Sequence, residues 1–500
     1  MSNTKPKVLL AVLDGWGLGK AYPGNAISLA NIPFFDSLWA KYPHTQLDTS
    51  GEAVGLPKGQ MGTSEVNHFA IGAGKVVSQD LVRINQAIED GSFYQNQALE
   101  KIFTHVKEND SSLHVWGLIG DGGVHSRQSH LLATVEAAKR FGLKKVYVHV
   151  VTDGRDTSPV SGVGFVEKLE SSLKELGVGE IVDVVGRYYA MDRDTNMDRT
   201  DLAFELYMNG KGEQFNNATE AIQASYDLKV TDEFIKPVVI GNTPRVILEN
   251  DGVIMVNFRN DRPRQITQRL LEKGPANLSI TTMTLYKPDF EVEVAFPPIK
   301  VATCLGKVIS NAGLKQLRVT ETEKFAHLTF FLNCKREEPF EDEDRFMFES
   351  NSDVATHDLK PEMRAPDIAQ KIVDDIKLES HEVIFTNLCN ADMVGHTGNI
   401  KATIKGCEAI DRALTKIVPV ALENGYVVII TADHGNAEEM LTDTGEMVTS
   451  HTCNPVPLII VSDKYQSLTK EGGTLIDMAP TVLKILGLEI PAEMTGQSFV

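Results

Sequence analysis

Acidic residues and histidines stand directly behind two short apolar runs of the chain. Asp14 follows the run Lys7–Leu13, and the adjacent pair Asp433 and His434 comes just after Tyr426–Thr431. Carboxylate oxygens and neutral imidazoles together suit divalent ions such as Mn²⁺ or Zn²⁺, whereas Mg²⁺ prefers more oxygen ligands. We therefore interpret these positions as candidate metal ligands.

A second group of ligand types follows the run Glu382–Thr386. Asp392 and His396 are four residues apart, so one helical turn would aim both side chains the same way, and His451 stands in a short polar segment further on. Any one of these aspartates could be a helix N-cap and any one histidine a structural hydrogen-bonding residue. The whole set makes that explanation weak, and six ligands with one serine oxygen would be enough for two ions, roughly 3.5–4 Å apart.

Ser64 is the candidate nucleophile. It stands in Met61-Gly62-Thr63-Ser64-Glu65-Val66-Asn67-His68, which opens a predicted helix. Its ordinary role there would be a helix N-cap, worth about 1 kcal/mol. The same position faces free backbone N–H groups and the positive end of the helix dipole, which favour a phosphate, and a divalent ion could activate the hydroxyl. Spacing alone does not decide between these roles.

Cationic side chains follow the apolar runs in the middle of the chain. The run Leu113–Leu118 leads to a histidine, and the runs Val146–Val151, Ile181–Val185 and Val253–Asn257 lead to arginines. The side chains concerned are His125, Arg155, Arg187, Arg193, Arg259 and Arg262. Guanidinium groups match carboxylate and phosphate oxygens with two hydrogen bonds at once, so four such strand ends predict a pocket for a small, multiply charged acid.

The overall charge makes this local cluster more informative. The 500 residues include 49 Lys and Arg against 68 Asp and Glu, a formal net charge of -19. Such a chain should repel nucleic acid and anionic membranes over most of its surface. The sequence therefore predicts a small-molecule substrate, with neither a nucleic-acid nor a membrane partner.

The elements that must position these residues alternate between apolar runs and amphipathic segments. Continuous β-branched runs followed by amphipathic segments are typical of α/β folds with mostly parallel sheets that are covered on both faces. The expected strands are Lys7–Leu13, Glu382–Thr386, Tyr426–Thr431 and Pro457–Val461 near the chain ends, and Leu113–Leu118, Val146–Val151, Ile181–Val185 and Val253–Asn257 in the middle. The expected helices include Ser129–Phe141, Val160–Leu176, Asp198–Asn209, Ile400–Glu423 and Leu475–Leu486.

Two groups of strands predict two domains. Pro297-Pro298 is a candidate stiff linker, and a second crossing is expected near Ala73–Ser78. We predict a metal-binding domain from residues 1–77 and 298–500, and an inserted substrate-binding domain from residues 78–297. The acidic run Glu337–Asp344 is predicted to be a solvated loop.

The five cysteines are scattered and show no CxxC spacing, which predicts reduced thiols in a cytoplasmic protein. No apolar stretch is long enough to span a bilayer. The run at residues 8–13 ends in Asp14-Gly15-Trp16-Gly17, which is not the pattern of a secretion signal.

At the candidate metal ligands, the candidate nucleophile and the arginine cluster, the chain resembles the 2,3-bisphosphoglycerate-independent phosphoglycerate mutases of the alkaline phosphatase superfamily. The similarity spans essentially the whole chain. Its motifs are Leu13-Asp14-Gly15-Trp16-Gly17, Met61-Gly62-Thr63-Ser64-Glu65-Val66, Thr152-Asp153-Gly154-Arg155-Asp156, Asn257-Phe258-Arg259-Asn260-Asp261-Arg262, Glu321-Thr322-Glu323-Lys324-Phe325-Ala326-His327, Asp392-Met393-Val394-Gly395-His396-Thr397-Gly398, Ala432-Asp433-His434-Gly435-Asn436 and His451-Thr452.

The resemblance implies an alkaline-phosphatase-like mixed sheet between helices, with an inserted second α/β domain. It also implies that Asp392, His396 and His451 hold one ion, most often Mn²⁺, and that Asp14, Ser64, Asp433 and His434 hold a second. The residues that it implies for substrate binding are His125, Arg155, Asp156, Arg187, Arg193, Arg259, Arg262 and Lys324. Lys324 has no signal of its own in the sequence.

The implied reaction interconverts 3-phosphoglycerate and 2-phosphoglycerate in glycolysis and gluconeogenesis, with Ser64 carrying the phosphate. Asp156 would be the general base, His125 would share proton transfer, and Lys324 would offset the charge of the phosphate. A closing motion between the domains is expected to exclude water, and a monomer is expected. The family usually has Gly at Asn67, Arg at Lys75 and Pro at Ala391, and none of these departures removes a ligand or a substrate cation.

Three alternatives stay open on the sequence. A metal-dependent phosphatase or phosphodiesterase could use the same metal core, although it would gain nothing from an arginine pocket for its leaving group. A pentose-phosphate mutase usually carries threonine as the nucleophile. A non-catalytic metal-binding protein is poorly supported, because no ligand position is missing.

Overall fold

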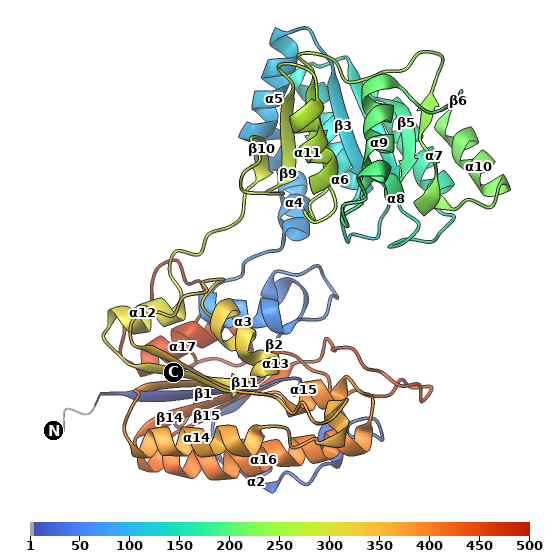
Figure 1. Ribbon diagram of the computed structural model, residues 1–500. Coiled ribbons are helices and arrows are strands. Elements are labelled where there is room, and N and C mark those ends of the chain that lie inside the picture. Colours follow the sequence, from blue (N-terminus) through green and yellow to red (C-terminus); the bar gives the residue numbers. More distant parts are fainter. Residues whose placement is uncertain (1–4) are drawn as a thin grey trace. The chain divides into compact units, whose positions relative to one another are not determined.

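The computed structural model describes residues 5–500. They divide into two compact units (Figure 1). Residues 5–78 and Lys300–Val500 form one unit, called the terminal unit here, and Gln79–Ile299 form the inserted unit. The expected boundaries differ from these by one residue at the first crossing and by two at the second. The roles given to the two domains remain predictions.

The terminal unit is built on one mixed sheet of order β12-β11-β13-β1-β14-β15-β2-β16. The first five strands in this order are parallel, β15 runs antiparallel to both of its neighbours, and β16 is parallel to β2. Its strands are β1 (Lys7–Leu13), β2 (His44–Asp48), β11 (Gln316–Glu321), β12 (Glu343–Phe348), β13 (Val383–Leu388), β14 (Tyr426–Thr431), β15 (Val456–Val461) and β16 (Gly473–Thr474).

Helices cover both faces of this sheet, with α2, α14 and α16 on one face and α3, α12 and α17 on the other (Figure 1). Strands β13 and β14 are buried along their whole length because of this double cover. The helices are α1 (Ala26–Leu29), α2 (Pro33–Lys41), α3 (Ser64–Ala73), α12 (Leu305–Asn311), α13 (Thr322–Ala326), α14 (Ala365–Lys377), α15 (Asn390–Gly395), α16 (Ile400–Glu423) and α17 (Met478–Ile485). A π-helical turn, His327–Phe331, directly follows α13.

The inserted unit has its own mixed sheet, of order β10-β9-β8-β3-β4-β5-β7-β6. All of its neighbouring strands are parallel except β5 and β7. Its strands are β3 (Leu113–Leu118), β4 (Val146–Thr152), β5 (Glu180–Gly186), β6 (Glu213–Phe215), β7 (Val238–Ile240), β8 (Gly252–Met255), β9 (Ser279–Thr284) and β10 (Glu293–Phe296).

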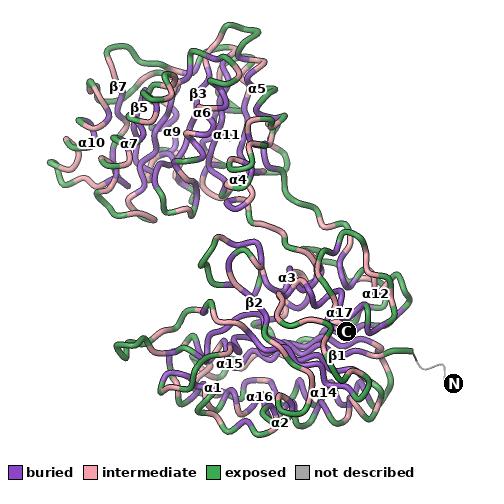
Figure 2. Tube along the Cα trace, turned by 180° about the vertical axis from the view of Figure 1, so that it is seen from behind, coloured by how far each residue is buried: buried purple, intermediate pink, exposed green. Residues whose placement is uncertain are grey.

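Two hydrophobic cores hold this sheet, one on each face, and Figure 2 shows the strands as buried. Helices α5, α6 and α7 pack on one core, and α9 and α11 pack on the other. The helices of the inserted unit are α4 (Asp80–Glu89), α5 (Gln97–Glu108), α6 (Gln128–Phe141), α7 (Gly162–Leu176), α8 (Arg187–Ala190), α9 (Met197–Asn209), α10 (Ala218–Asp227) and α11 (Arg264–Lys273).

The predicted two-part α/β class with mixed sheets is confirmed. The predicted helix Ile400–Glu423 has the observed bounds, and the predicted Leu475–Leu486 divides into a 3₁₀ turn, Leu475–Asp477, and α17. The prediction that Glu337–Asp344 is a solvated loop is wrong at its end. Glu343 begins β12 and is buried, because Asn333 and Arg345 donate hydrogen bonds to its carboxylate.

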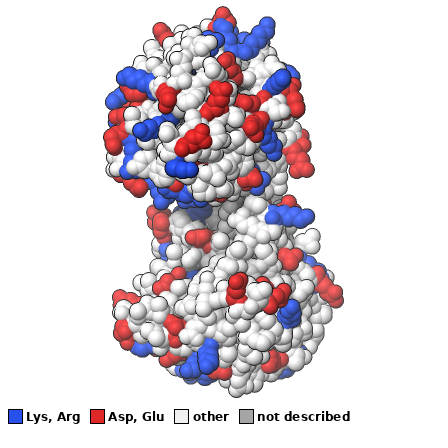
Figure 3. Space-filling model, turned by 90° about the vertical axis from the view of Figure 1, so that its right-hand side faces the viewer, with Lys and Arg blue, Asp and Glu red and all other residues white. Residues whose placement is uncertain are grey.

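Charges of both signs are interspersed on the face that Figure 3 shows. The net negative charge of the chain is therefore not gathered in one patch on that face. Within residues 5–500, the helices include none that is long and apolar enough to cross a membrane.

Candidate active site

Three neighbouring strands of the terminal unit bring three aspartates to one edge of its sheet. Asp14 directly follows β1, Asp433 lies two residues after β14, and Asp392 lies in α15, which follows β13. Strands β13 and β14 both pair with β1 in parallel, so their carboxyl ends meet at the same edge. All three side chains are buried. The structure thus brings together the three predicted strand-end aspartates.

Gly15 allows the close approach of Asp14 and Asp392. Its φ is +76°, and an added Cβ would lie 2.6 Å from the Cα of Asp392. The backbone N–H of Asp392 also donates to the carbonyl of Asp14 at 3.0 Å. Only glycine fits this backbone position without strain, which explains why an Asp-Gly pair follows the first strand.

Ser64 is the first residue of α3, and it is 5% exposed. The alternative role of helix N-cap is wrong, because Thr63 caps the helix with its side chain, which accepts from the N–H of Val66. The hydroxyl of Ser64 makes other contacts instead. Its Oγ lies 2.9 Å from His434 Nε2 and accepts a hydrogen bond from Lys324 Nζ at 2.8 Å.

Asp392, His396 and His451 form one cluster of ligand types. The two Nε2 atoms lie 3.1 and 3.3 Å from Asp392 Oδ1 and 3.1 Å from each other. Each ring donates Nδ1–H to a backbone carbonyl, at 2.6 Å to Thr449 and at 2.8 Å to Gly62. A neutral ring that donates through Nδ1 leaves Nε2 as the ligand atom, which is how bound metals are usually supported by their surroundings.

Asp14, Asp433 and His434 surround Ser64 on the other side of the cluster. His434 Nε2 lies 3.7 Å from Asp14 Oδ1 and 3.4 Å from Asp433 Oδ2. Ligand atoms of Asp14, Asp392 and His434 also fall within 4.8 Å of one another. The seven residues predicted as metal ligands therefore lie in one continuous group.

Lys324 lies in α13, at the carboxyl end of β11, and points into the same group. Its Nζ is 2.7 Å from Asp14 Oδ1 and 2.8 Å from Asp392 Oδ2. Burial alone would lower the pKa of Lys324, but the charges of the three aspartates raise it well above its usual value. The lysine is therefore a fixed cation beside Ser64.

Three buried carboxylates against one buried ammonium leave this group electrostatically unbalanced. Burial and the charge of Asp433 raise the pKa of Asp14 well above its usual value. Burial opposes the ionisation of Asp392 too, but Lys324 and the nearby histidines hold the pKa of Asp392 well below its usual value. A surplus of negative charge in a buried place is what a divalent cation would offset.

His68 joins this group, and sequence reasoning gave it no role. It lies one helical turn after Ser64, with Nδ1 at 2.9 Å from the carbonyl oxygen of Ser64 and 3.4 Å from Asp433 Oδ2. Asn387 donates to Asp14 Oδ2 at 2.7 Å and lies 3.1 Å from His68 Nε2. The spacing of four residues from Ser64, which places both on one face of a helix, could have indicated that His68 lies beside the nucleophile.

Two further amides hold the ligand groups in place. Asn436 Nδ2 donates to Asp392 Oδ1 at 3.1 Å. Asn67 Nδ2 donates to the carbonyls of Asp433, at 2.6 Å, and of Thr49, at 3.0 Å. The family that the chain resembles usually has glycine at the position of Asn67. Here the asparagine side chain connects α3 to the backbone of Asp433, a candidate metal ligand.

The donor set fits divalent metal ions. It combines buried carboxylates with imidazoles whose Nε2 atoms face the same oxygen, and Asp433 Oδ2 accepts no hydrogen bond from the described residues. Buried carboxylate oxygens rarely lack donors unless a cation or water completes them. Mixed oxygen and nitrogen donors suit Mn²⁺ or Zn²⁺ better than Mg²⁺.

The inserted unit gathers its predicted cations where β3, β4, β5 and β8 end. Arg187 is buried and donates from one nitrogen to Asp153 Oδ1 and Asp156 Oδ2, both at 2.6 Å. Arg193 and Arg259 both pair with Asp261, at 2.9 and 3.2 Å. The remaining contacts of the cluster are Arg155 with Glu233, Arg262 Nη1 with the carbonyl of Met191 at 3.1 Å, and His125 with Asp156 and Asp261 at 3.8 and 3.6 Å.

The guanidinium groups crowd one another in this cluster. Burial and the neighbouring charges of Arg187, Arg193 and Arg155 lower the pKa of Arg262. Strongly perturbed pKa values cluster at functional sites of proteins. The structure thus brings the five predicted arginines into one site of the inserted unit.

The two proton-transfer candidates have different charge states. Burial and the charge of Arg187 lower the pKa of His125 to about 4, so its ring is neutral at neutral pH. Burial opposes the ionisation of Asp156, but its hydrogen bond with Arg187 lowers the pKa of Asp156 overall. Asp156 is therefore an ionised carboxylate, held by a buried cation.

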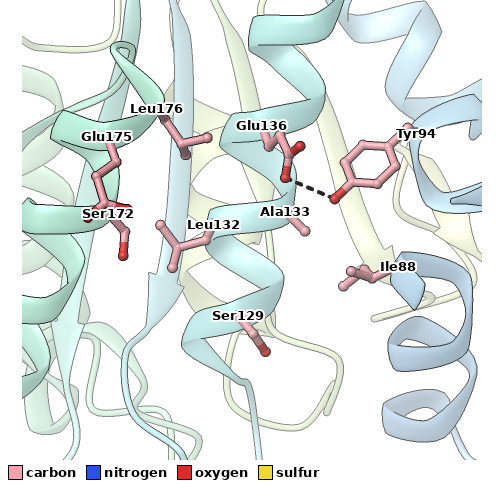
Figure 4. Close-up of a pocket in the computed structure, with 9 residues that line it drawn as sticks. All are labelled: Ile88, Tyr94, Ser129, Leu132, Ala133, Glu136, Ser172, Glu175 and Leu176. Carbon is pink, nitrogen blue, oxygen red and sulfur yellow. Dashed lines mark hydrogen bonds between the residues drawn. The ribbon is translucent and has the colours of Figure 1, made fainter.

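A groove of about 350 Å³ lies elsewhere on the inserted unit, over α6 and α7. Figure 4 shows the side chains that line it, among them Tyr94, Leu132, Glu136 and Leu176. Tyr94 donates to Glu136 at 3.0 Å, and Arg140 also pairs with Glu136. Glu136 is thus already partnered, and the groove contains none of the predicted site residues.

Comparison with known proteins gives a consistent result. The family model "BPG-independent PGAM N-terminus" matches residues 84–288. The 2,3-bisphosphoglycerate-independent phosphoglycerate mutase of Listeria innocua is 46% identical over 99% of each chain, and that of Moorella thermoacetica is 46% identical over 99% of this chain and 98% of its own. The solved structure of Leishmania mexicana phosphoglycerate mutase, described at low cobalt concentration, is 30% identical, with a TM-score of 0.59 over 99% of this chain and 98% of that one.

The fold and the buried ligand group define a two-part α/β enzyme with candidate metal sites. The full-length similarity then gives the family. The chain belongs to the 2,3-bisphosphoglycerate-independent phosphoglycerate mutases. The predicted isomerase function, that of a phosphoglycerate mutase, is confirmed, and the phosphatase or phosphodiesterase alternative is not favoured. The family is metal-dependent, and the candidate metal groups of this chain agree with that.

Proposed function

We propose that Ser64 is the nucleophile that carries the phosphate between the two positions of glycerate. The observation that supports this is the surroundings of its hydroxyl, which lies within 2.9 Å of both Lys324 Nζ and His434 Nε2. As the first residue of α3, Ser64 also stands beside backbone N–H groups that have no partner within the helix. The same atoms that would activate the hydroxyl would bind the phosphate that it receives.

We further propose that the terminal unit binds two divalent ions and that both are Mn²⁺. Asp392, His396 and His451 would hold one, and Asp14, Ser64, Asp433 and His434 would hold the other. Such ions would lower the pKa of the Ser64 hydroxyl and offset the charge of the phosphate. The surplus of buried carboxylates around Ser64 supports this assignment.

Lys324 supplies the fixed positive charge from the chain itself. In the proposed reaction its ammonium contacts an oxygen of the transferring phosphate while Ser64 Oγ forms the new P–O bond and the bond to the glycerate oxygen breaks. The charge spreads over the outer phosphate oxygens in that transition state. A preorganised cation that is already buried does not have to give up water when it stabilises this charge.

The arginine cluster would bind the carboxylate of the substrate and keep the glycerate in place. Arg155, Arg193 and Arg259 are the candidates for direct contact, because nearly half of each side chain is exposed. Asp156 would accept the proton of the hydroxyl that takes the phosphate back, and neutral His125 could relay it. Retention of the glycerate makes the outcome transfer instead of hydrolysis.

The proposed physiological setting is glycolysis and gluconeogenesis in the cytoplasm, with phosphoglycerate as the only partner and a monomeric protein. The family assignment and the composition of the chain support these proposals. They are independent of the proposed chemistry at Ser64.

One assay tests the nucleophile. Wild type, Ser64→Ala and the matched control Ser37→Ala, an exposed serine of α2, receive 3-phosphoglycerate and Mn²⁺ without bisphosphoglycerate. We expect loss of mutase activity in Ser64→Ala and in chelator-treated wild type, and normal activity in Ser37→Ala. Mass spectrometry of acid-quenched wild type should find phosphate on the peptide that contains Ser64.

Persistent 2-phosphoglycerate formation by Ser64→Ala would contradict the assignment of Ser64 as the nucleophile. Phosphate found on another residue would move the nucleophile and leave the family assignment intact. Activity that survives removal of metal would contradict the two-ion assignment alone.

A further inference from the structure

Cys304 and Cys334 lie together in the terminal unit, and the proposed function uses neither of them. Their thiols are hydrogen-bonded to each other. Cys304 is the residue before α12, and Cys334 lies in the turn that follows the π-helical turn His327–Phe331. Cys304 is buried, whereas Cys334 is partly exposed, and both are free thiols.

The two segments are pressed closely together. An added Cβ at Gly306 would lie 2.7 Å from Asn333 Oδ1 and 2.9 Å from Arg318 Nη2. Arg318 Nη2 also donates to Asn333 Oδ1 at 3.3 Å. The first turn of α12 and the turn that holds Cys334 therefore enclose the guanidinium group of Arg318.

Arg318 is a buried cation with incomplete partners. It is 1% exposed, and its Nη2 donates to Gln316 and Asn333, but its Nε and Nη1 find no acceptor among the described residues. Glu343 is the nearby carboxylate, and Asn333 and Arg345 already donate to it. Glu343 is the anion that acts on Arg318, but it is shared with Arg345, so a thiolate beside Arg318 would also be stabilised.

We propose that Cys304 and Cys334 form a dithiol that hydroperoxides oxidise to a disulfide, and that this modification slows the mutase reaction. Cys304, which faces Arg318, is the thiol that reacts first. Cys334 resolves the intermediate. The oxidant is a peroxide small enough to enter beside the partly exposed Cys334.

The chemistry balances with hydrogen peroxide as the only added reactant. The thiolate sulfur of Cys304 attacks one peroxide oxygen, an S–O bond forms, the O–O bond breaks, and hydroxide leaves and takes up a proton as water. The sulfur of Cys334 then attacks the sulfur of Cys304, an S–S bond forms, and the S–O bond breaks. The second hydroxide leaves with the proton of Cys334 as water, so two thiols and one peroxide give one disulfide and two waters.

The charges around the pair favour this order of events. The hydrogen bond from Cys334 lowers the pKa of Cys304 to about 7, against the effect of burial, and Arg318 contributes in the same direction. Glu343 opposes it, and Lys75 faces Cys334. Burial raises the pKa of both Cys389 and Cys407, so these other buried thiols should stay unreactive.

The position of the pair connects it to the proposed site. The turn with Cys334 packs on α3, where an added Cβ at Gly72 would lie 1.9 Å from the carbonyl oxygen of Leu332. It also continues the chain segment that begins with Lys324. A disulfide draws the sulfurs closer than their hydrogen-bonded separation, so it would shift segments that position Ser64 and Lys324. A misplacement of about 1 Å can cost up to ~10²-fold in rate, so we expect a fall in kcat of roughly tenfold.

The test uses the reduced full-length protein with hydrogen peroxide. Free thiols are counted after denaturation, cross-linked peptides are mapped without reduction, and mutase activity is measured before and after a thiol reductant. Wild type has five cysteines, and oxidation should leave three titratable thiols. Cys304→Ser and Cys334→Ser should form no cross-link and keep their activity, while the control Cys407→Ser, changed in the buried face of α16, should behave as wild type.

A Cys304–Cys334 peptide together with a reversible loss of activity supports the proposal. Absence of that peptide, or a cross-link between other cysteines, overturns it. A cross-link that leaves kcat unchanged overturns the effect on the reaction. Equal loss of activity in wild type and in both serine variants also overturns it, because the oxidative damage would then lie elsewhere. Two serine variants are used so that the comparison can still be made if one of them does not fold.

Discussion

The two units place opposite chemistry at the same position of similar sheets. In the terminal unit, the ends of neighbouring parallel strands carry aspartates, histidines and one lysine, and nearly all of these side chains are buried. In the inserted unit, the strand ends carry arginines, and Arg155, Arg193 and Arg259 are 45–47% exposed. In the proposed function, the first edge binds cations and the second binds anions.

The difference in exposure suggests different tasks for the two sites. A buried group of charges has lost its hydration during folding, so it can act on a reacting phosphate without further reorganisation. In the proposed function, exposed arginines would keep their mobility and follow a substrate that must turn. Arg187 departs from this pattern, because it is buried and paired with two aspartates of its own unit. It orders the arginine site from within.

The largest test of this contrast is Lys324→Met. The change removes the only lysine among three buried aspartates and keeps the length of the side chain. We expect kcat to fall on the order of 10²–10³-fold, because a preorganised charge contact is lost in the transition state. Steady-state kinetics at saturating Mn²⁺ measure this, with Lys401→Met, an exposed lysine of α16, as the control. A change confined to KM would mean that Lys324 only binds substrate.

The second test separates the buried arginine from the exposed ones. Arg187→Ala leaves Asp153 and Asp156 without their shared partner, so the inserted unit should lose about 3–5 kcal/mol of stability. Arg259→Ala removes an exposed group, so its stability should change by about 0–1 kcal/mol while KM rises. Denaturant unfolding and KM on the same preparations measure both. Equal destabilisation of the two variants would remove the distinction between them.

These contrasts show what sequence patterns could and could not predict. Strands β1, β3 and β14 consist mostly of apolar residues, so their bounds were predicted as observed. Strand β11 was missed because its residues read Gln-Leu-Arg-Val-Thr-Glu. Arg318 and Glu321 are buried there by specific partners, which a pattern of hydrophobicity does not reveal.

The missed strand also explains why Lys324 had no signal. The rule that ligands lie beyond the carboxyl ends of strands led to Asp14, Asp392 and Asp433. Lys324 obeys the same rule, because it follows β11, but an unrecognised strand has no recognisable end. Only the family resemblance indicated it. Partners further out, such as Asn387, depend on three-dimensional packing and could not be read from spacing.

The third test concerns His68, which supports the terminal site from outside the predicted ligands. Asn387 donates to its Nε2, so its Nδ1–H faces the carbonyl of Ser64. His68→Leu should weaken Mn²⁺ binding by about 10–100-fold, as loss of a residue behind metal ligands typically does. His68→Asn keeps a donor near the position of Nδ1 and should restore part of the affinity. Calorimetric titration measures it, and tight Mn²⁺ binding by His68→Leu would show that the ligands need no such support.

The smallest expected effect is on the pH dependence of stability, and it concerns one histidine at the amino end of each sheet. In the terminal unit, His381 faces Asp375 at 2.9 Å and Asp344 at 3.0 Å. Burial opposes its protonation, but these two carboxylates raise the pKa of His381 overall. In the inserted unit, burial lowers the pKa of His114 to about 4, although Asp251 lies 3.1 Å away.

The signs of the two shifts predict different responses to pH. The folded pKa of His381 is above its unfolded value of about 6.5, so its stabilisation is complete below that pH and is lost as the pH rises through the folded pKa. His381→Gln should therefore lower the melting temperature more at about pH 6 than at about pH 9, by an amount equivalent to about 1 kcal/mol or less. Burial keeps His114 neutral in the folded state at both values, whereas its unfolded ring is largely protonated at about pH 6. His114 therefore contributes less stability at about pH 6 than at about pH 9, so His114→Gln should lower the melting temperature less at about pH 6. A pH-independent effect of His381→Gln would mean that its carboxylates do not hold it protonated. The same direction of pH dependence in both variants would mean that the two units treat their amino-end histidines alike.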